Sequence, residues 1–202
     1  MAAAPQTSVD QLRRVQYVQT ITIVWMSAEA VLSLAAAWMA RSPALLAFGG
    51  DSAVELISAG LVVWSFRSRQ KNANRMAARL SGILLFVVSF FVLLTSAMAL
   101  LGYSELSRSY LGIVVLLTAA VVMPWLAKQK RRLSAETGSA ALRADAAESA
   151  LCGYLSLIAL AGLLVNAVWH VRWADPIAAL VIVPLVVREG WEALRGKSCA
   201  CY

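Results

Sequence analysis

The stretch PALLAFGGDSAVELISAGLVVWSF, residues 43–66, decides what kind of fold this chain adopts. It is longer than the roughly 20 apolar residues that a helix needs to cross a bilayer core of about 30 Å. Two carboxylates, Asp51 and Glu55, interrupt the apolar run near its middle. A charge at that depth is costly unless it faces a protein interior and finds a partner there. The stretch therefore predicts a transmembrane helix whose inner face has a function.

The rest of the chain has the composition of a membrane protein. Of its 202 residues, 60% are hydrophobic and only 14% are charged, whereas about a quarter of the residues in a soluble domain are charged. We expect an all-α membrane protein with six transmembrane helices in one domain, and the composition suits a bacterial inner membrane. The predicted segments are residues 17–40, 43–66, 80–101, 110–127, 139–168 and 176–194.

Basic residues between the apolar segments predict how the chain crosses the membrane. Of the 18 lysines and arginines, only Arg41, Arg108 and Arg172 fall on the side opposite the N-terminus. Because cytoplasmic loops are enriched in Lys and Arg, we expect both the N- and the C-terminus in the cytoplasm. The predicted parts are a cytoplasmic arm at 1–16, the helical domain at 17–194 and a cysteine-containing tail at 195–202. No basic run is interleaved with aromatic residues, so nucleic acid is not expected as a partner.

The spacing of Asp51 and Glu55 indicates what the second segment does. Residues four apart project from the same face of a helix, and Ser58 extends that stripe. Two like charges so close together should either share a proton or hold a cation. The pair therefore predicts a proton-coupled cation site. The competing interpretation is structural, with the carboxylates satisfying buried backbone or pairing with a basic residue inside the bundle.

The fifth segment offers a second group of ligands. Glu148 and Cys152 are again four residues apart, and Asp145 lies three residues earlier on the same stripe. With the pair on the second segment they make four candidate ligands, the coordination number of a tetrahedral zinc-type site. The three residues of the fifth segment each have an alternative interpretation. Glu148 could lie at the membrane interface, Cys152 could be a small buried residue, and Asp145 could lie near a helix N-terminus or behind the ligands.

The chain resembles the cation diffusion facilitator family of six-helix metal transporters, in a short form without the C-terminal cytoplasmic domain. The stretches that carry the resemblance are DSAVE at 51–55, ESALC at 148–152 just after RAD, and WADPIAALVIVPLVVREGWEALRG at 173–196. The resemblance implies proton-coupled efflux of a divalent metal by a homodimer. Zinc is the expected ion, with Cd, Co, Mn and Fe as alternatives. The family's usual histidine and aspartate on helix five are Glu148 and Cys152 here, and a thiolate favours softer ions than carboxylates do.

A few further residues have two interpretations each. Glu29, deep in the first segment, could relay protons or form a hydrogen bond with a neighbouring helix. Asp175 is expected to cap the sixth helix. Cys199 and Cys201 should stay reduced in the cytoplasm, where they could recruit a soft metal or simply belong to a flexible tail.

Counting residues raises a difficulty for a single site. At 1.5 Å per residue, Asp51 lies about 12 Å from the start of its helix at Pro43, whereas Cys152 lies about 25 Å from Trp169 at the end of its own helix. One site then requires a later start to the outer loop, a tilted helix, or predicted helix ends that are misplaced by several residues.

The sequence contains no motif of an ATP-driven pump or of the common hydrolases, so we expect neither an enzyme nor a resident cofactor. Transport energy should then come from an ion gradient. Two alternatives stay open: a membrane metal-binding or scaffold protein that does not transport, and a proton-coupled exporter of organic cations.

Overall fold

The computed structural model describes residues 9–68, 73–103, 107–137 and 140–195, and the side chains of residues 13–57, 79–103, 107–136, 142–143 and 145–195. The described residues form helices without a strand. In chain order these are α1 (Val9–Ala40), α2 (Pro43–Ser68), α3 (Ala73–Leu100), α4 (Tyr110–Thr137), α5 (Ala140–Trp169) and α6 (Ala174–Leu194).

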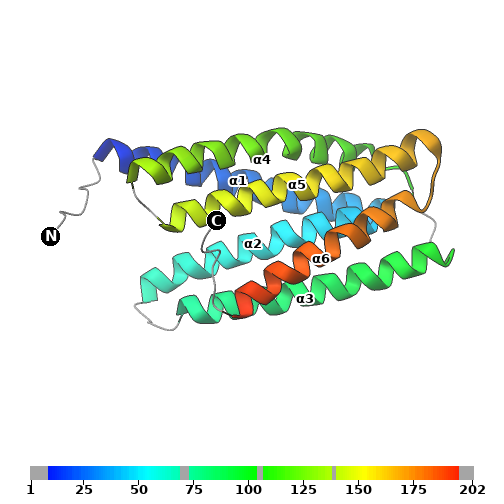
Figure 1. Ribbon diagram of the computed structural model, residues 1–202, viewed down its shortest axis with the longest axis horizontal. Coiled ribbons are helices and arrows are strands. Elements are labelled where there is room, and N and C mark those ends of the chain that lie inside the picture. The colour runs from blue at the N-terminus through cyan, green and yellow to red at the C-terminus, as the bar shows by residue number, and fades with distance from the viewer. Residues whose placement is uncertain (1–8, 69–72, 104–106, 138–139, 196–202) are drawn as a thin grey trace.

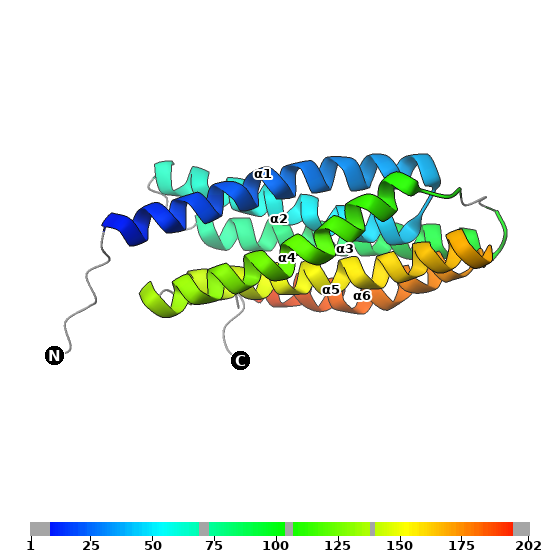
Figure 2. The same ribbon diagram turned by 90° about the horizontal axis from the view of Figure 1, so that it is seen from above.

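The helices run alternately up and down a long bundle (Figures 1 and 2). We call the end where α1 begins and α6 finishes the terminal end, and the opposite one the far end. The three far-end turns each contain a residue in the left-handed region: Arg41 (φ 54°), Gly102 (φ 83°) and His170 (φ 58°). A residue of this kind closes a helix C-terminus and reverses the chain within a few residues. The turn after α3 has the complete pattern, in which Tyr103 N–H donates to Met98 O at 2.9 Å and Gly102 N–H to Ala99 O at 3.2 Å.

Helix α2 occupies the middle of the bundle. It contacts α1, α3, α5 and α6, while α4 packs on α1 and α5. Glycines allow this close packing. A Cβ added at Gly49 would lie 2.5 Å from Ser33 Oγ on α1, and one added at Gly50 would lie 2.6 Å from Val88 on α3. Small residues let transmembrane backbones approach closely, so the Gly49–Gly50 pair brings α1 and α3 against α2 just before Asp51.

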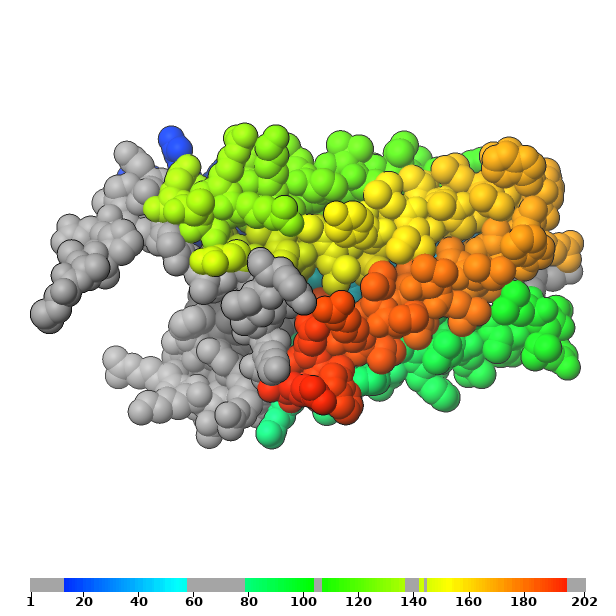
Figure 3. Space-filling view, viewed as in Figure 1, coloured from blue at the N-terminus to red at the C-terminus, as the bar shows by residue number. Residues whose placement is uncertain are grey.

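The outer surface has the character of a lipid-facing one. Four stretches of the described residues are long and apolar enough to cross a membrane: Arg13–Ala40, Arg79–Leu100, Tyr110–Glu136 and Asp145–Trp169. One face of the bundle, where α5 and α6 lie between α4 and α3, is shown in Figure 3. Aromatic side chains gather at the far end, as is typical of a membrane interface. They are Trp38, Tyr103, Tyr110, Trp169 and Trp173, all at least 59% exposed.

The prediction of an all-α membrane protein with six helices is confirmed, whereas the predicted bounds differ at several helix ends. Helix α1 begins at Val9 instead of residue 17, α3 at Ala73 instead of 80, and α4 continues to Thr137 instead of ending at 127. Hydropathy locates the apolar span, but a helix continues through polar residues beyond it. Lys128 and Lys130, which the sequence placed in a connection, therefore lie on α4. The cytoplasmic location of the termini stays a prediction.

Candidate functional site

The start of α2 is held by two polar side chains. Ser42 Oγ accepts a hydrogen bond from Leu45 N–H at 3.1 Å, and Asp175 Oδ1 accepts one from Ala44 N–H at 3.0 Å. Both bonds satisfy N–H groups that have no partner within the first turn of a helix. The prediction that Asp175 caps α6 is wrong: the cap position of α6 is Trp173, which has no side-chain cap, and Asp175 caps α2 instead. The start of α6 is thereby fastened to the start of α2.

Asp51 lies where α2 is most enclosed. Its side chain is 1% exposed, and its Oδ1 atom is buried without a hydrogen-bond partner among the described residues. Its carboxyl group interacts with that of Glu189 on α6, and the Oε2 atom of Glu189 is also buried without a hydrogen-bond partner among the described residues.

Glu189 is not among the residues predicted from the sequence, although the sequence contains a signal for it. The buried face of α6 includes Ile182, Val186 and Gly190. Glu189 lies seven residues after Ile182 and three after Val186, so it falls on this inward stripe. Because it lies near the charged end of α6, the sequence makes it look like one of the solvent-exposed residues there.

Glu29 of α1 joins three helices at the centre of the bundle. It is 2% exposed. Its Oε1 accepts hydrogen bonds from Ser52 Oγ at 2.8 Å and from the Cys152 thiol at 3.4 Å, and its Oε2 accepts one from Trp25 Nε1 at 2.6 Å. Glu29 therefore accepts hydrogen bonds from α2 and α5 in the structure, while its role as a proton relay and its protonation stay predictions.

The contacts of Glu29 also show that Asp51 and Cys152 can belong to one site although they lie at different distances from the ends of their helices. Ser52, the neighbour of Asp51, and Cys152 both contact one carboxylate, so they lie at the same level of the bundle. Figure 2 shows the reason: the turn between α5 and α6 extends farther at the far end than the turn between α1 and α2. The helices end at different depths, an explanation that the count of residues did not include.

Glu55 and Glu148 complete an acidic cluster inside the bundle. The charge of Glu55 interacts with those of Asp51, Glu148 and Glu29, and the charge of Glu148 interacts with that of Asp51. Like charges in a poorly solvated interior favour a bound proton or cation over full ionisation. The cluster draws on four helices, and its members are Glu29, Asp51, Glu55, Glu148, Cys152 and Glu189.

The cluster is not a preformed metal site. Among the described residues, no three His, Cys, Asp or Glu side chains are close enough together to hold an ion. The ligand set Asp51, Glu55, Glu148 and Cys152 therefore stays a prediction. The thiol of Cys152 is also engaged with Glu29. The side chain of Ser58 and the residues Cys199 and Cys201 lie outside what the structure describes.

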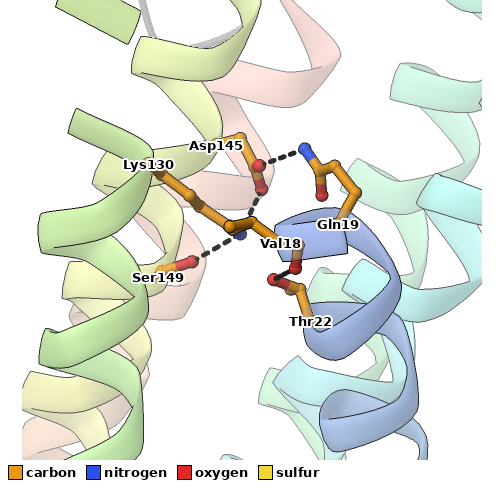
Figure 4. A network of polar contacts seen from close by, with 6 residues as sticks. All are labelled: Val18, Gln19, Thr22, Lys130, Asp145 and Ser149. Atoms are coloured by element: carbon orange, nitrogen blue, oxygen red, sulfur yellow. Dashed lines mark hydrogen bonds and ion pairs between the residues drawn. The ribbon is translucent and has the colours of Figure 1, made fainter. Parts of the chain in front are cut away.

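Asp145 belongs to a separate network nearer the terminal end (Figure 4). Its Oδ1 accepts from Lys130 Nζ of α4 at 2.7 Å, and its Oδ2 accepts from Gln19 Nε2 of α1 at 2.7 Å. Lys130 also donates to Ser149 Oγ at 2.8 Å. Asp145 is thus the partner of a buried lysine, which was not predicted from the sequence.

Comparison with known proteins agrees with the arrangement of acidic side chains inside a helical membrane bundle. Residues 20–197 match the family described as the cation efflux transmembrane domain. The manganese efflux system protein MneS of Bacillus subtilis is 22% identical over 200 residues, which cover 94% of this chain and 69% of that protein. The uncharacterized transporter YdbO of the same organism is 22% identical over 180 residues, which cover 84% of this chain and 62% of that protein.

The chain therefore spans about two thirds of the length of these two relatives. The family match covers almost the whole chain and includes all four predicted ligands, so the resemblance drawn from DSAVE and ESALC is confirmed. This chain is a multi-pass membrane protein that belongs to the cation efflux family.

Proposed function

We propose that the protein exports a divalent transition-metal ion from the cytoplasm in exchange for protons, and that Asp51, Glu55, Glu148 and Cys152 bind the ion. The observation that carries the proposal is the state of Asp51, whose Oδ1 atom is buried without a hydrogen-bond partner among the described residues. A carboxylate oxygen in that environment is costly unless a cation or a proton binds it. Membership of a cation efflux family makes a transported cation the natural occupant.

Proton exchange follows from the crowding of acidic groups. The charges of Asp51, Glu55 and Glu189 interact with one another inside the bundle. An arriving divalent cation neutralises charge that bound protons neutralise in its absence. The same carboxylates can therefore hold either the ion or protons, which couples the two flows.

The proposed ligands include both carboxylates and a thiol, and these two kinds of donor favour different ions. The carboxylates favour a harder ion such as Mn²⁺, whereas a Cys152 thiolate would favour Zn²⁺ or Cd²⁺. The relative MneS is named for manganese efflux. In the structure the Cys152 thiol donates to Glu29 Oε1, so an ion that binds the sulfur must displace this contact.

The first test is metal uptake by proteoliposomes with an acidic lumen. We expect Mn²⁺ or Zn²⁺ to enter the lumen while protons leave it, because an exporter inserted inside-out moves its ion into the vesicle. A metal-sensitive dye and a pH-sensitive dye in the lumen measure both flows, and an ionophore that collapses the proton gradient serves as the control. Metal flux without proton counterflow would contradict the coupling. Metal binding without flux, in folded protein, would favour the scaffold function instead.

Cys152→Ser tests whether the sulfur takes part in selecting the ion. If it does, the ratio of Cd²⁺ to Mn²⁺ uptake should fall by about tenfold, equivalent to about 1.4 kcal/mol of differential binding. The protein with Cys199→Ser and Cys201→Ser is the matched control, because it loses two thiols and keeps Cys152. An unchanged ion ranking would remove Cys152 from the ligand set.

A further inference from the structure

The strongest unexplained feature is Lys130, a lysine buried in a helix whose neighbouring basic residues are exposed. Its side chain is 0% exposed, whereas Lys128, Arg131 and Arg132 on the same helix are exposed. A buried ammonium group is costly unless it is paired and fully hydrogen-bonded. Lys130 is paired with Asp145 at 2.7 Å and also donates to Ser149 at 2.8 Å, so two of its three N–H groups have these partners, which are four residues apart on α5.

The network also reaches a third helix. The second oxygen of Asp145 accepts from Gln19, so one carboxylate joins α1, α4 and α5. Figure 4 shows Lys130 and Gln19 approaching Asp145 from opposite sides. The Asp145 side chain is 28% exposed while that of Lys130 is 0% exposed. The network therefore lies at a boundary between solvent and the closed interior.

Its position relative to the acidic cluster is fixed by the helices that carry it. On α5, Glu148 and Cys152 follow Asp145 by three and seven residues, or about 5 and 10 Å along the axis. On α1, Glu29 follows Gln19 by ten residues, or about 15 Å. Asp145 and Gln19 thus lie nearer the terminal end than the cluster does, while Ser149 lies at the level of Glu148. The charge of Lys130 also acts on Glu148.

We propose that Lys130, with Asp145, Ser149 and Gln19, is a latch that closes the terminal end of the ion pathway and places an internal cation beside Glu148 while no metal is bound. This role rests on the proposed transport function. The terminal end is the side predicted to face the cytoplasm, so the latch must open before an ion from there reaches Asp51 and Cys152, which are each 1% exposed. When α1, α4 and α5 separate at that end, an entering metal ion takes over the charge that Lys130 supplies and so stabilises the open state.

Cys152 reports on the latch without any need for transport. It is 1% exposed, and the Cys199→Ser, Cys201→Ser background leaves it as the single thiol of the chain. The rate of its alkylation by iodoacetamide, a neutral reagent, is measured on purified protein in detergent. A neutral reagent is required because removing the charge of Lys130 would by itself change the local concentration of a charged one.

Lys130→Met and Asp145→Asn should each raise the alkylation rate about tenfold or more, because the reagent reacts with the population in which the latch is open. Arg131→Met, which removes the same charge from the adjacent exposed position, should leave the rate unchanged. The exchanged pair Lys130→Asp, Asp145→Lys should return the rate toward that of the background protein. Gln19→Leu, which breaks the link to α1 and leaves the ion pair intact, should give an intermediate increase.

Equal rates in Lys130→Met, Asp145→Asn and the background protein would overturn the latch. A high alkylation rate in the exchanged pair would also overturn the latch if its melting temperature matched that of the background protein. The restored ion pair would then stabilise the fold without controlling access to Cys152. If a single variant does not fold, the exchanged pair and Gln19→Leu still decide the matter. Alkylation does not depend on flux, so a protein that fails to transport can still confirm or refute the latch.

Discussion

Asp51→Asn should reduce metal flux in proteoliposomes by about 100-fold, equivalent to about 3 kcal/mol of lost cation binding. The amide has nearly the shape of the carboxylate but carries no charge, and it cannot supply an anionic oxygen to the ion. The effect should be large because Asp51 is 1% exposed and water cannot replace the missing charge. Initial rates for wild type and variant, measured over a range of metal concentrations, provide the comparison.

Glu136→Gln is the matched control for Asp51→Asn. Glu136 is an exposed carboxylate at the end of α4, so the substitution removes one negative charge without touching the cluster. We expect its flux to equal that of wild type. Wild-type flux in Asp51→Asn would show that the ion follows a path without Asp51, and the proposed site would have to be abandoned.

Glu29→Leu should lower the free energy of unfolding by about 2–4 kcal/mol. Leucine has a similar size but leaves the Trp25 N–H and the Cys152 thiol without the acceptor they use now. An unsatisfied buried donor costs about 1–3 kcal/mol. Ser52 loses less, because its single O–H can donate instead to Phe48 O, which lies 3.2 Å from Ser52 Oγ. Reversible unfolding in mixed micelles, followed by circular dichroism, measures the difference.

Two companion variants make the Glu29 result specific. Glu29→Gln keeps one carbonyl acceptor and should cost less than Glu29→Leu. Glu192→Leu breaks only the ion pair with Arg188, whose side chain is 70% exposed, and pairs of that kind contribute about 0–1 kcal/mol. A loss in Glu29→Leu no greater than that in Glu192→Leu would mean that the three hydrogen bonds at Glu29 do not hold α1, α2 and α5 together.

The sequence alone was sufficient for features that depend on length and local spacing. Six apolar stretches predicted six helices because the width of the bilayer sets how many residues must be apolar. The start of α2 at Pro43 was predicted correctly, and Ser42 and Pro43 are favourable residues at a helix N-terminus. The four-residue spacing within DSAVE and ESALC led to the family, which the match over residues 20–197 confirms.

The buried partners were harder to predict, although part of the signal was present. Lys130 continues the inward stripe of α4 formed by Leu116, Ala119, Met123 and Leu126. A basic residue just beyond an apolar span is normally a solvated one, which is why it was assigned to a connection. Only the position of Asp145 and Ser149 on α5 shows that the stripe continues into a closed interior.

What the sequence by itself determined is therefore the membrane class, the number of helices and the helix faces that carry carboxylates. The tertiary structure decided which faces meet: Glu29 with Cys152, Asp51 with Glu189, Lys130 with Asp145, and Asp175 with the start of α2. The physical reason is that apolar length and side-chain spacing are properties of one helix. The partner of a buried polar group depends on the depth and rotation of another helix, which packing between helices sets.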